Sequence, residues 1–241
     1  MSDRRVFVGH PLSEGDHWVP DPSTLHYLSR VLRVTPGEEF HGFDASAAGY
    51  RLEWRSEVEG FRVLRKISPA SPPPWTLSLF QALPKGPKFD QILRQCTEAG
   101  VQAFFPLLTE RTVVRLAPEE REGKLGRWEK ILQEASRQCG RSDVPSLDCP
   151  MDWAEGLDRL GSFDLIVMLY EGKAEPLRQV LESNRQARRL ALLVGPEGGW
   201  SPAEVEAAVG RGARTAHLPT PILRTETAPL AATAMIRFHF S

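Results

Sequence analysis

The pattern of apolar and polar residues changes once along the chain, near residue 70. Before that point, short runs in which apolar and polar residues alternate are separated by glycines, as in half-exposed β-strands. The strand-like runs are residues 5–9, 38–45, 49–60 and 61–67. Together they predict a small β-rich domain built as a barrel.

One amphipathic helix is predicted within this first part. Asp21 supplies a capping side chain, Pro22 lies in the first turn, and the pair Pro36-Gly37 ends the helix. The predicted apolar face of this helix consists of Leu25, Leu28, Val31 and Leu32.

Beyond residue 74, strand-like and helix-like segments alternate. The strand-like segments are almost continuously apolar and cover residues 75–83, 101–108, 163–170, 189–194 and 214–219. The helix-like segments cover residues 89–98, about 119–138, 175–184, 202–210 and the end of the chain from about 226. This alternation predicts an α/β fold with a mostly parallel sheet that is covered by helices on both faces.

A proline-rich segment separates the two parts. Residues 68–74 contain four prolines, which can continue neither a helix nor a central strand, so we expect a stiff, extended linker. The predicted organisation is a first domain over residues 1–68, a linker over 69–74 and a second domain over 75–241.

Composition narrows the function classes only slightly. The chain has 241 residues and a net charge of -1, so any nucleic-acid-binding surface must be local. Cys96, Cys139 and Cys149 lack the C-x-x-C spacing, which argues against a zinc site and a disulfide framework. No apolar run is long enough to cross a bilayer, and no signal-peptide core begins the chain. We therefore expect a cytoplasmic protein without metal or membrane contact.

The stretch "LLVGPEGGWSPAE", residues 192–204, is the most informative segment for function. It predicts a strand, a glycine-rich loop and a helix start. Ser201 is the expected N-cap, Pro202 the first helical residue, and Glu204 the third, which completes a capping box. Ser201 thus has a structural role and is not a candidate nucleophile.

The glycine-rich loop does not match the phosphate-binding templates. It lacks a Lys-Ser/Thr pair and the G-x-G-x-x-G pattern, and Glu197 would repel a pyrophosphate. A carboxylate at this position suits a ribose hydroxyl, an amine or a positively charged ligand. The alternative is that the glycines only form a tight turn and that Glu197 points to water.

Two other loops also follow strands and favour a ligand site. Residues 169–172 again offer a carboxylate, and residues 218–227 follow the last strand. Ligands of open α/β sheets bind at the carboxyl ends of the strands. Two prolines stiffen the last loop, and Ile222 and Leu223 would form an apolar wall suited to a planar base.

The segments "LLVGPEGGWSPAEVEAA" and "LPTPILRTETA" resemble the SPOUT class of methyltransferases. The chain is most similar to the bacterial 16S rRNA uracil-N3 methyltransferases. This similarity extends over nearly the whole chain, including "HYLSRVLRVTPGEEF", "ALPKGPKFDQILRQCTEAGVQAFFPLLTERTVVR" and "RWEKILQEASRQCGRSDVP". It implies a trefoil-knotted second domain, S-adenosylmethionine as cofactor, a homodimer and a PUA-like RNA-binding first domain.

The resemblance also implies roles for individual residues in the three loops. The implied cofactor-binding residues are Leu169, Glu171, Gly195, Pro196, Glu197, Gly199, Leu218, Ile222, Leu223, Thr225 and Thr227. This chain departs from the family pattern at Trp200, which replaces a smaller aromatic residue, and at Pro229, where a helix former is usual. We therefore expect the final helix to begin later than in relatives.

The implied reaction moves a methyl group from a sulfonium to N3 of uracil. Loss of the N3 proton places negative charge on the ring, which Arg224 would stabilise, and Glu226 is the nearest candidate base. The alternative for Glu226 is a carboxylate that favours a helix N-terminus. The alternative for Arg224 is a solvated or salt-bridged side chain.

The implied substrate is 16S rRNA in the small ribosomal subunit, and RNA contact requires local cations. The candidates are Arg4, Arg5, Arg30, Arg33, Lys85, Lys88, Arg137 and Arg141. A basic helix face that is only solvated is the alternative for the last two.

Three function classes follow from the sequence. The leading hypothesis is a 16S rRNA uracil-N3 methyltransferase, and a related one is a SPOUT enzyme with another target such as a ribose 2′-hydroxyl. The second class is a non-catalytic RNA-binding assembly factor, which would not need an intact cofactor pocket. The third, a nucleotide-binding enzyme, is disfavoured by Glu197 and by the absence of a phosphate-loop lysine.

Overall fold

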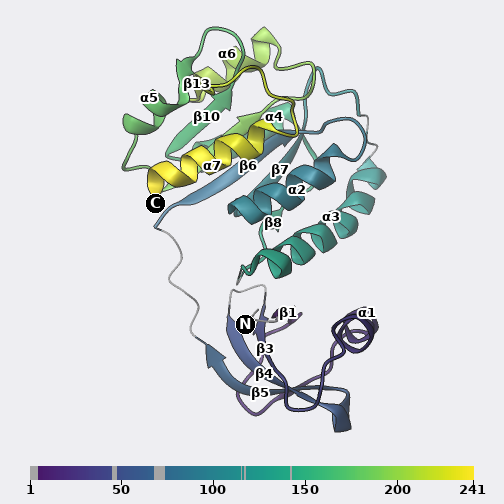
Figure 1. Ribbon diagram of the computed structural model, residues 1–241. Helices are drawn as coiled ribbons and strands as arrows, with labels where there is room; N and C mark the ends of the chain where they lie inside the picture. The colour runs from purple at the N-terminus through teal and green to yellow at the C-terminus, as the bar shows by residue number, and fades with distance from the viewer. Residues whose placement is uncertain (1–4, 45–47, 68–73, 115, 117, 142) are drawn as a thin grey trace. The chain divides into compact units, whose positions relative to one another are not determined.

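The computed structural model describes residues 5–44, 48–67, 74–114, 116, 118–141 and 143–241 (Figure 1). The chain divides into two compact units. The first comprises Met1–Pro72 with Ser136–Val144, and the second comprises Pro73–Ala135 with Pro145–Ser241. Arg4 and the proline-rich segment, except for Pro74, lie outside the described residues.

The first unit contains a curled five-stranded sheet with the order β1-β3-β4-β5-β2. The strands are β1 (Arg5–Phe7), β2 (His17–Trp18), β3 (Glu39–Phe43), β4 (Gly49–Arg55) and β5 (Gly60–Ile67). β1 and β3 are parallel, and the remaining pairs are antiparallel. Alternate residues of β4 are buried, as the sequence pattern predicts, and Tyr50, Leu52 and Trp54 form part of the core.

The predicted helix of the first unit begins as expected but ends early. α1 (Pro22–His26) is capped by the side chain of Asp21, and the chain continues as a π-helical segment over Tyr27–Leu32. It ends at Arg33, which adopts a left-handed conformation, so the predicted end at Pro36-Gly37 is wrong. Leu28 is buried, Leu25 and Leu32 pack against the core, and the side chain of Val31 lies outside the described set.

The second unit contains an eight-stranded sheet in which every pair is parallel. The strand order is β11-β13-β10-β12-β6-β7-β8, and β9 also pairs with β7. The strands are β6 (Thr76–Ala82), β7 (Ala103–Leu108), β8 (Ser146–Leu147), β9 (Met151–Asp152), β10 (Leu165–Leu169), β11 (Glu175–Pro176), β12 (Arg189–Val194) and β13 (Arg214–His217).

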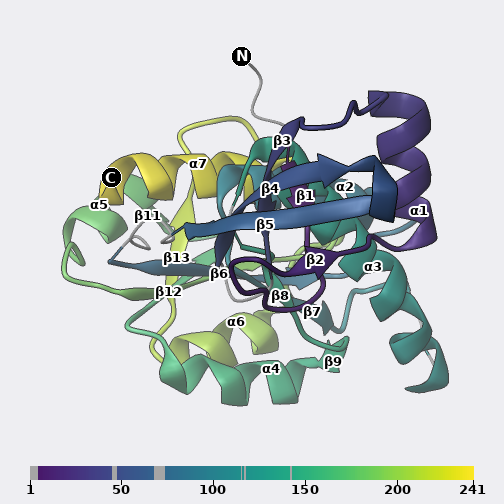
Figure 2. The same ribbon diagram turned by 90° about the horizontal axis from the view of Figure 1, so that it is seen from below.

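Helices cover both faces of this sheet, which confirms the predicted α/β class. α2 (Lys88–Ala99) and α7 (Ala228–Phe240) lie side by side on one face, and α4 (Trp153–Arg159) and α6 (Pro202–Gly210) lie on the other (Figure 2). α3 (Pro118–Cys139) lies beside α2, and α5 (Leu177–Glu182) lies near the β11 edge. Phe80, Met168 and Leu193, from three different strands, belong to the hydrophobic core between the sheet and the helices α4 and α6.

Three features of the second unit differ from the sequence-based expectation. Residues 175–184 do not form one helix, because Glu175 and Pro176 extend as β11 and pair with β13 before α5 begins. The structure also contains β8, β9 and α4, which the sequence pattern did not predict. The final helix begins at Ala228 with Pro229 in its first turn, later than residue 226.

Candidate active site at the ends of three parallel strands

Three loops meet at the carboxyl ends of β10, β12 and β13, because β10 lies between the other two strands. They enclose a pocket of about 900 Å³. Every predicted cofactor residue except Thr227 lines this pocket, and Arg224 and Glu226 line it as well. Several other lining residues were not predicted from the sequence to belong to this pocket. They include Lys88, Arg111, Tyr170, Trp200 and His217.

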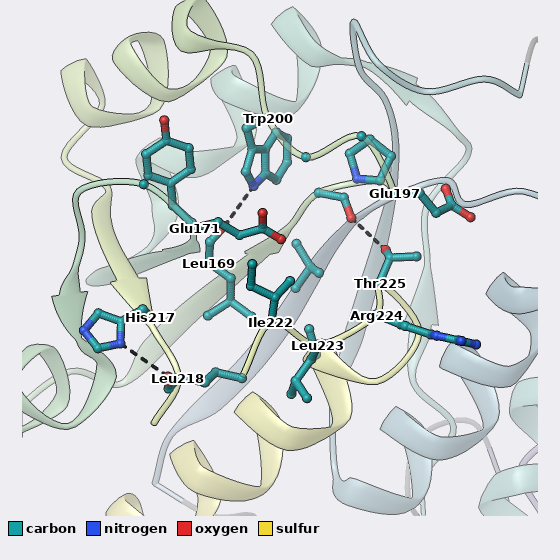
Figure 3. A pocket seen from close by; sticks show the side chains of 18 of the residues that line it. Leu169, Glu171, Glu197, Trp200, His217, Leu218, Ile222, Leu223, Arg224 and Thr225 are labelled. Carbon is teal, nitrogen blue, oxygen red and sulfur yellow. Dashed lines mark hydrogen bonds between the residues drawn. The ribbon is translucent and has the colours of Figure 1, made fainter. Parts of the chain in front are cut away.

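The glycine-rich loop favours glycine at two positions. Gly199 adopts a positive φ of 67°, and a Cβ atom on Gly195 would lie 3.2 Å from Nε1 of Trp200. Trp200 is buried and donates a hydrogen bond from Nε1 to the carbonyl oxygen of Leu169, at 3.1 Å (Figure 3). This bond joins the loop after β12 to the end of β10.

The capping box predicted for α6 is present. Ser201 accepts a hydrogen bond from the backbone N–H of Glu204, and Oε2 of Glu204 accepts one from the N–H of Ser201 at 2.9 Å. The other oxygen of Glu204 accepts a hydrogen bond from the N–H of Glu110 at 2.7 Å. The buried Glu204 therefore also fixes the loop after β7 next to the pocket.

Thr225 and Thr227, which the sequence grouped together, differ in the structure. Thr225 is buried, donates from its hydroxyl to the carbonyl of Gly195 at 2.7 Å, and accepts from Nε2 of Gln81 at 3.2 Å. Thr227 is exposed, lies outside the pocket lining, and its side chain makes no capping bond with a described residue. Thr225 thus holds two cofactor loops together.

Glu197 pairs with a protein cation. Its Oε1 atom lies 2.9 Å from Nζ of Lys88 and accepts the backbone N–H of Lys85 at 3.1 Å. Partial burial alone would raise the pKa of Glu197, but the hydrogen bonds, above all that from Lys88, hold it below its ordinary value. The hydrogen bond with Glu197 raises the pKa of Lys88. In the free protein the positive group that Glu197 faces is therefore a lysine of the protein, and a contact with a ribose hydroxyl or a positively charged ligand stays a prediction.

Glu226 contacts the same lysine. Its Oε2 atom is 3.4 Å from Nζ of Lys88, and only 12% of its side chain is exposed. That oxygen is buried and accepts no hydrogen bond from the described residues. Arg224, two residues earlier, is exposed at the pocket.

One part of the pocket wall is apolar. Ile222 lies near the middle of the close-up view and is 75% exposed, while Leu218 and Leu223 are half-buried (Figure 3). An apolar wall that is exposed in the free protein, together with carboxylates, fits a ligand with a planar base and a positive group. S-adenosylmethionine has both features.

The predicted RNA-binding residues are divided between the two units. Arg30 and Arg33 are exposed in the first unit, and β1 includes Arg5, whose side chain is not described. Also within the first unit, Arg137 lies 4.6 Å from the ring centre of Tyr27, and Arg141 forms a bidentate pair with Asp143. In the second unit, Lys85 is exposed and Lys88 is in the pocket. RNA binding by these residues remains a prediction.

Comparison with known proteins identifies the family. Residues 71–237 match the model of the RNA methyltransferase domain. The chain belongs to the RNA methyltransferase family. The Ribosomal RNA small subunit methyltransferase E proteins of Synechocystis and Bacillus subtilis are 34% and 31% identical to it. The alignment with the Synechocystis protein covers 88% of this chain and 70% of that protein. The alignment with the Bacillus subtilis protein covers 89% of this chain and 87% of that protein.

A solved relative has the same fold over nearly the whole chain. The structure of Ribosomal RNA small subunit methyltransferase E from Neisseria gonorrhoeae bound to S-adenosyl methionine superposes with a TM-score of 0.88. It is 28% identical, and the match covers 98% of this methyltransferase and 97% of the relative.

Two of the lining residues could have been found from the sequence. Arg111 follows β7, whose end lies at the same sheet edge, and donates a hydrogen bond from Nη1 to the carbonyl of Gly198 at 2.9 Å. Tyr170 is in the loop that was already predicted to contribute Glu171.

Within the described part of the methyltransferase, no group of three or more His, Cys, Asp or Glu residues could hold a metal ion, and no helix is suited to crossing a membrane.

Proposed function

We propose that this protein uses S-adenosylmethionine to methylate N3 of one uridine in 16S rRNA of the small ribosomal subunit. The observation that carries this proposal is the combination, in one pocket, of an exposed apolar wall at Ile222 with Arg224 and Glu226. The names of the relatives and the cofactor in the Neisseria structure support the substrate and the methyl donor.

The residues of the three loops would hold the cofactor. Leu218, Ile222 and Leu223 would contact the adenine, and Glu171 would lie near the methionine or ribose part. Bound there, S-adenosylmethionine would supply a methyl group that is attached to a positively charged sulfur. Transfer of this methyl group to N3 would leave S-adenosylhomocysteine. The residues of the chain orient the two reactants and favour the deprotonated base.

Glu226 is suited to receive the N3 proton. Its buried Oε2 atom, which accepts no hydrogen bond from a described residue, has a lone pair available for the proton. Arg224 remains positively charged and would stabilise the negative charge that develops on the ring carbonyls. The Lys88 ammonium lies 3.4 Å from Oε2 of Glu226 and would keep the carboxylate in place at the pocket.

The remaining family features are part of the same proposal. We propose a trefoil knot in the second unit, a PUA-like RNA-binding role for the first, and a homodimer as the active form. The candidate RNA contacts are the exposed Arg30, Arg33 and Lys85.

The proposal is tested on small subunits from cells that lack the modification. After incubation with the protein and S-adenosylmethionine, the rRNA is scanned by primer extension. A methyl group on N3 blocks base pairing, so we expect a new cofactor-dependent stop at one uridine.

Arg224→Ala and Glu226→Gln are expected to reduce the rate by about 100-fold, since positioned charges and bases contribute factors of this order. Uptake of labelled methyl without a stop would instead favour the ribose 2′-hydroxyl. Subunit binding without any methyl uptake would overturn the enzyme assignment and favour an assembly factor.

A further inference from the structure

Lys85 and Lys88 flank the same Gly-Pro turn, and the sequence predicted the same phosphate contact for both. The structure separates them. Lys85 is exposed and uses its backbone N–H to bind Glu197, whereas Lys88 lines the pocket and its ammonium group contacts two carboxylates there. Only 33% of the Lys88 side chain is exposed. A lysine so placed is poorly suited to contact the RNA backbone.

The ammonium group of Lys88 joins two carboxylates from different loops. It lies 2.9 Å from Oε1 of Glu197, after β12, and 3.4 Å from Oε2 of Glu226, after β13. Lys88 is the first residue of α2, so a third element reaches into the contact between the two loops. Among the described residues, Lys88 is the one charged partner of Glu226.

We propose that Lys88 is a positioning residue of methyl transfer: it holds Glu226 as a fixed carboxylate at the pocket and couples it to the glycine-rich loop through Glu197. This inference rests on the proposed role of Glu226 as proton acceptor. The bond to Glu197 anchors the lysine, and the weaker contact leaves Oε2 of Glu226 able to accept a proton.

The first test is a comparison of three variants with saturating S-adenosylmethionine. K88M is expected to lower kcat by about 10- to 100-fold, part of what a general base contributes, while K88R recovers part of the loss. K85M removes the same charge from the same turn, and we expect this variant to have a higher KM for the ribosomal subunit. If K88M instead raises KM for the subunit as K85M does and leaves kcat unchanged, Lys88 is a phosphate contact.

A double variant tests whether Lys88 acts through Glu226. If it does, K88M/E226Q is expected to be no more than about 3-fold slower than the slower single variant, because both changes remove one function. Losses that multiply would mean that Lys88 acts independently of Glu226.

A measurement independent of turnover uses ¹³C-labelled glutamate and carboxyl NMR, with the Glu226 signal assigned from E226Q. In K88M we expect the Glu226 carboxyl signal at neutral pH to move from its wild-type position, because the ammonium group 3.4 Å from Oε2 is lost. The Glu171 signal is the internal control. An unchanged Glu226 signal would overturn the inference. Failure of the wild-type protein to methylate the subunit would instead reject the proposed function, whatever the NMR result.

Discussion

Substitution of Thr225 by valine removes one hydroxyl group and preserves the shape of the side chain. In the structure that hydroxyl donates to the carbonyl of Gly195 at 2.7 Å and accepts from Nε2 of Gln81 at 3.2 Å. Gln81 keeps a second bond to the carbonyl of Ala82 at 2.9 Å, so its amide is not left unpaired. The principal loss is therefore the donor to Gly195.

The magnitude follows from the surroundings of these groups. Thr225 is 7% exposed, so its hydroxyl exchanges little with water, and each hydrogen bond has a net value of about 1 kcal/mol. Gly195 borders the pocket, and water can solvate its carbonyl after the substitution. We expect T225V to lower the free energy of unfolding by about 1–2 kcal/mol. The glycine-rich loop also loses its link to the loop after β13, so the affinity for S-adenosylmethionine should fall about 10-fold.

The matched control is T227V, which makes the same chemical change two residues away. Thr227 is exposed and lies outside the pocket lining, so T227V should change the free energy of unfolding by less than about 0.5 kcal/mol. T225S, which keeps the hydroxyl, should retain most of the affinity. Urea unfolding and calorimetric titration with S-adenosylmethionine measure the two quantities. Equal results for T225V and T227V would refute the role assigned to the Thr225 hydroxyl.

Two further predictions concern other parts of the chain. Hydrogen bonds from Ser23 and then Thr24 lower the pKa of Asp21 from 3.8 to about 2, so its stabilisation of the first unit is present above pH 3.8 and lost as the pH falls through about 2. Because Asp21 is exposed, the free energy of unfolding of the wild type should exceed that of D21A by less than about 1 kcal/mol, and this difference should disappear in acid. If the cap were not formed, the two proteins would not differ at any pH. Ile222 is 75% exposed, so I222S should leave thermal stability nearly unchanged and weaken S-adenosylmethionine binding by about 1–2 kcal/mol; unchanged binding would show that Ile222 is not covered by the cofactor.

The regular elements of the second unit were predictable because their signals are local. The strand β10 is a continuous apolar run, β12 is apolar after its first residue, and β6 is mostly apolar. The start of α6 is specified by the capping box of Ser201 and Glu204. The short elements were not predictable. β8 and β11 are two residues long and exist because a neighbouring strand offers hydrogen bonds, which no local pattern records.

The composition of the pocket was partly predictable for a similar reason. Strand order in a parallel sheet brings loops that follow strands to one edge, so Leu169, Glu197 and Ile222 could be grouped before their positions were known. The direction of each side chain could not be predicted. Thr225 and Thr227 have the same chemistry and lie two residues apart, and only the turn that starts α7 directs the first inward and the second outward.

The contacts between loops explain why the pocket depends on residues that no single loop motif reveals. Trp200 joins the glycine-rich loop to the end of β10 through the carbonyl of Leu169, and Thr225 joins the loop after β13 to Gly195. Lys88 connects α2 to the glycine-rich loop and to the loop after β13. Since each contact links a different pair of elements, the position of every pocket wall depends on its neighbours. Loss of one contact should therefore weaken the effect of losing a second, and double substitutions among these residues should be less than additive.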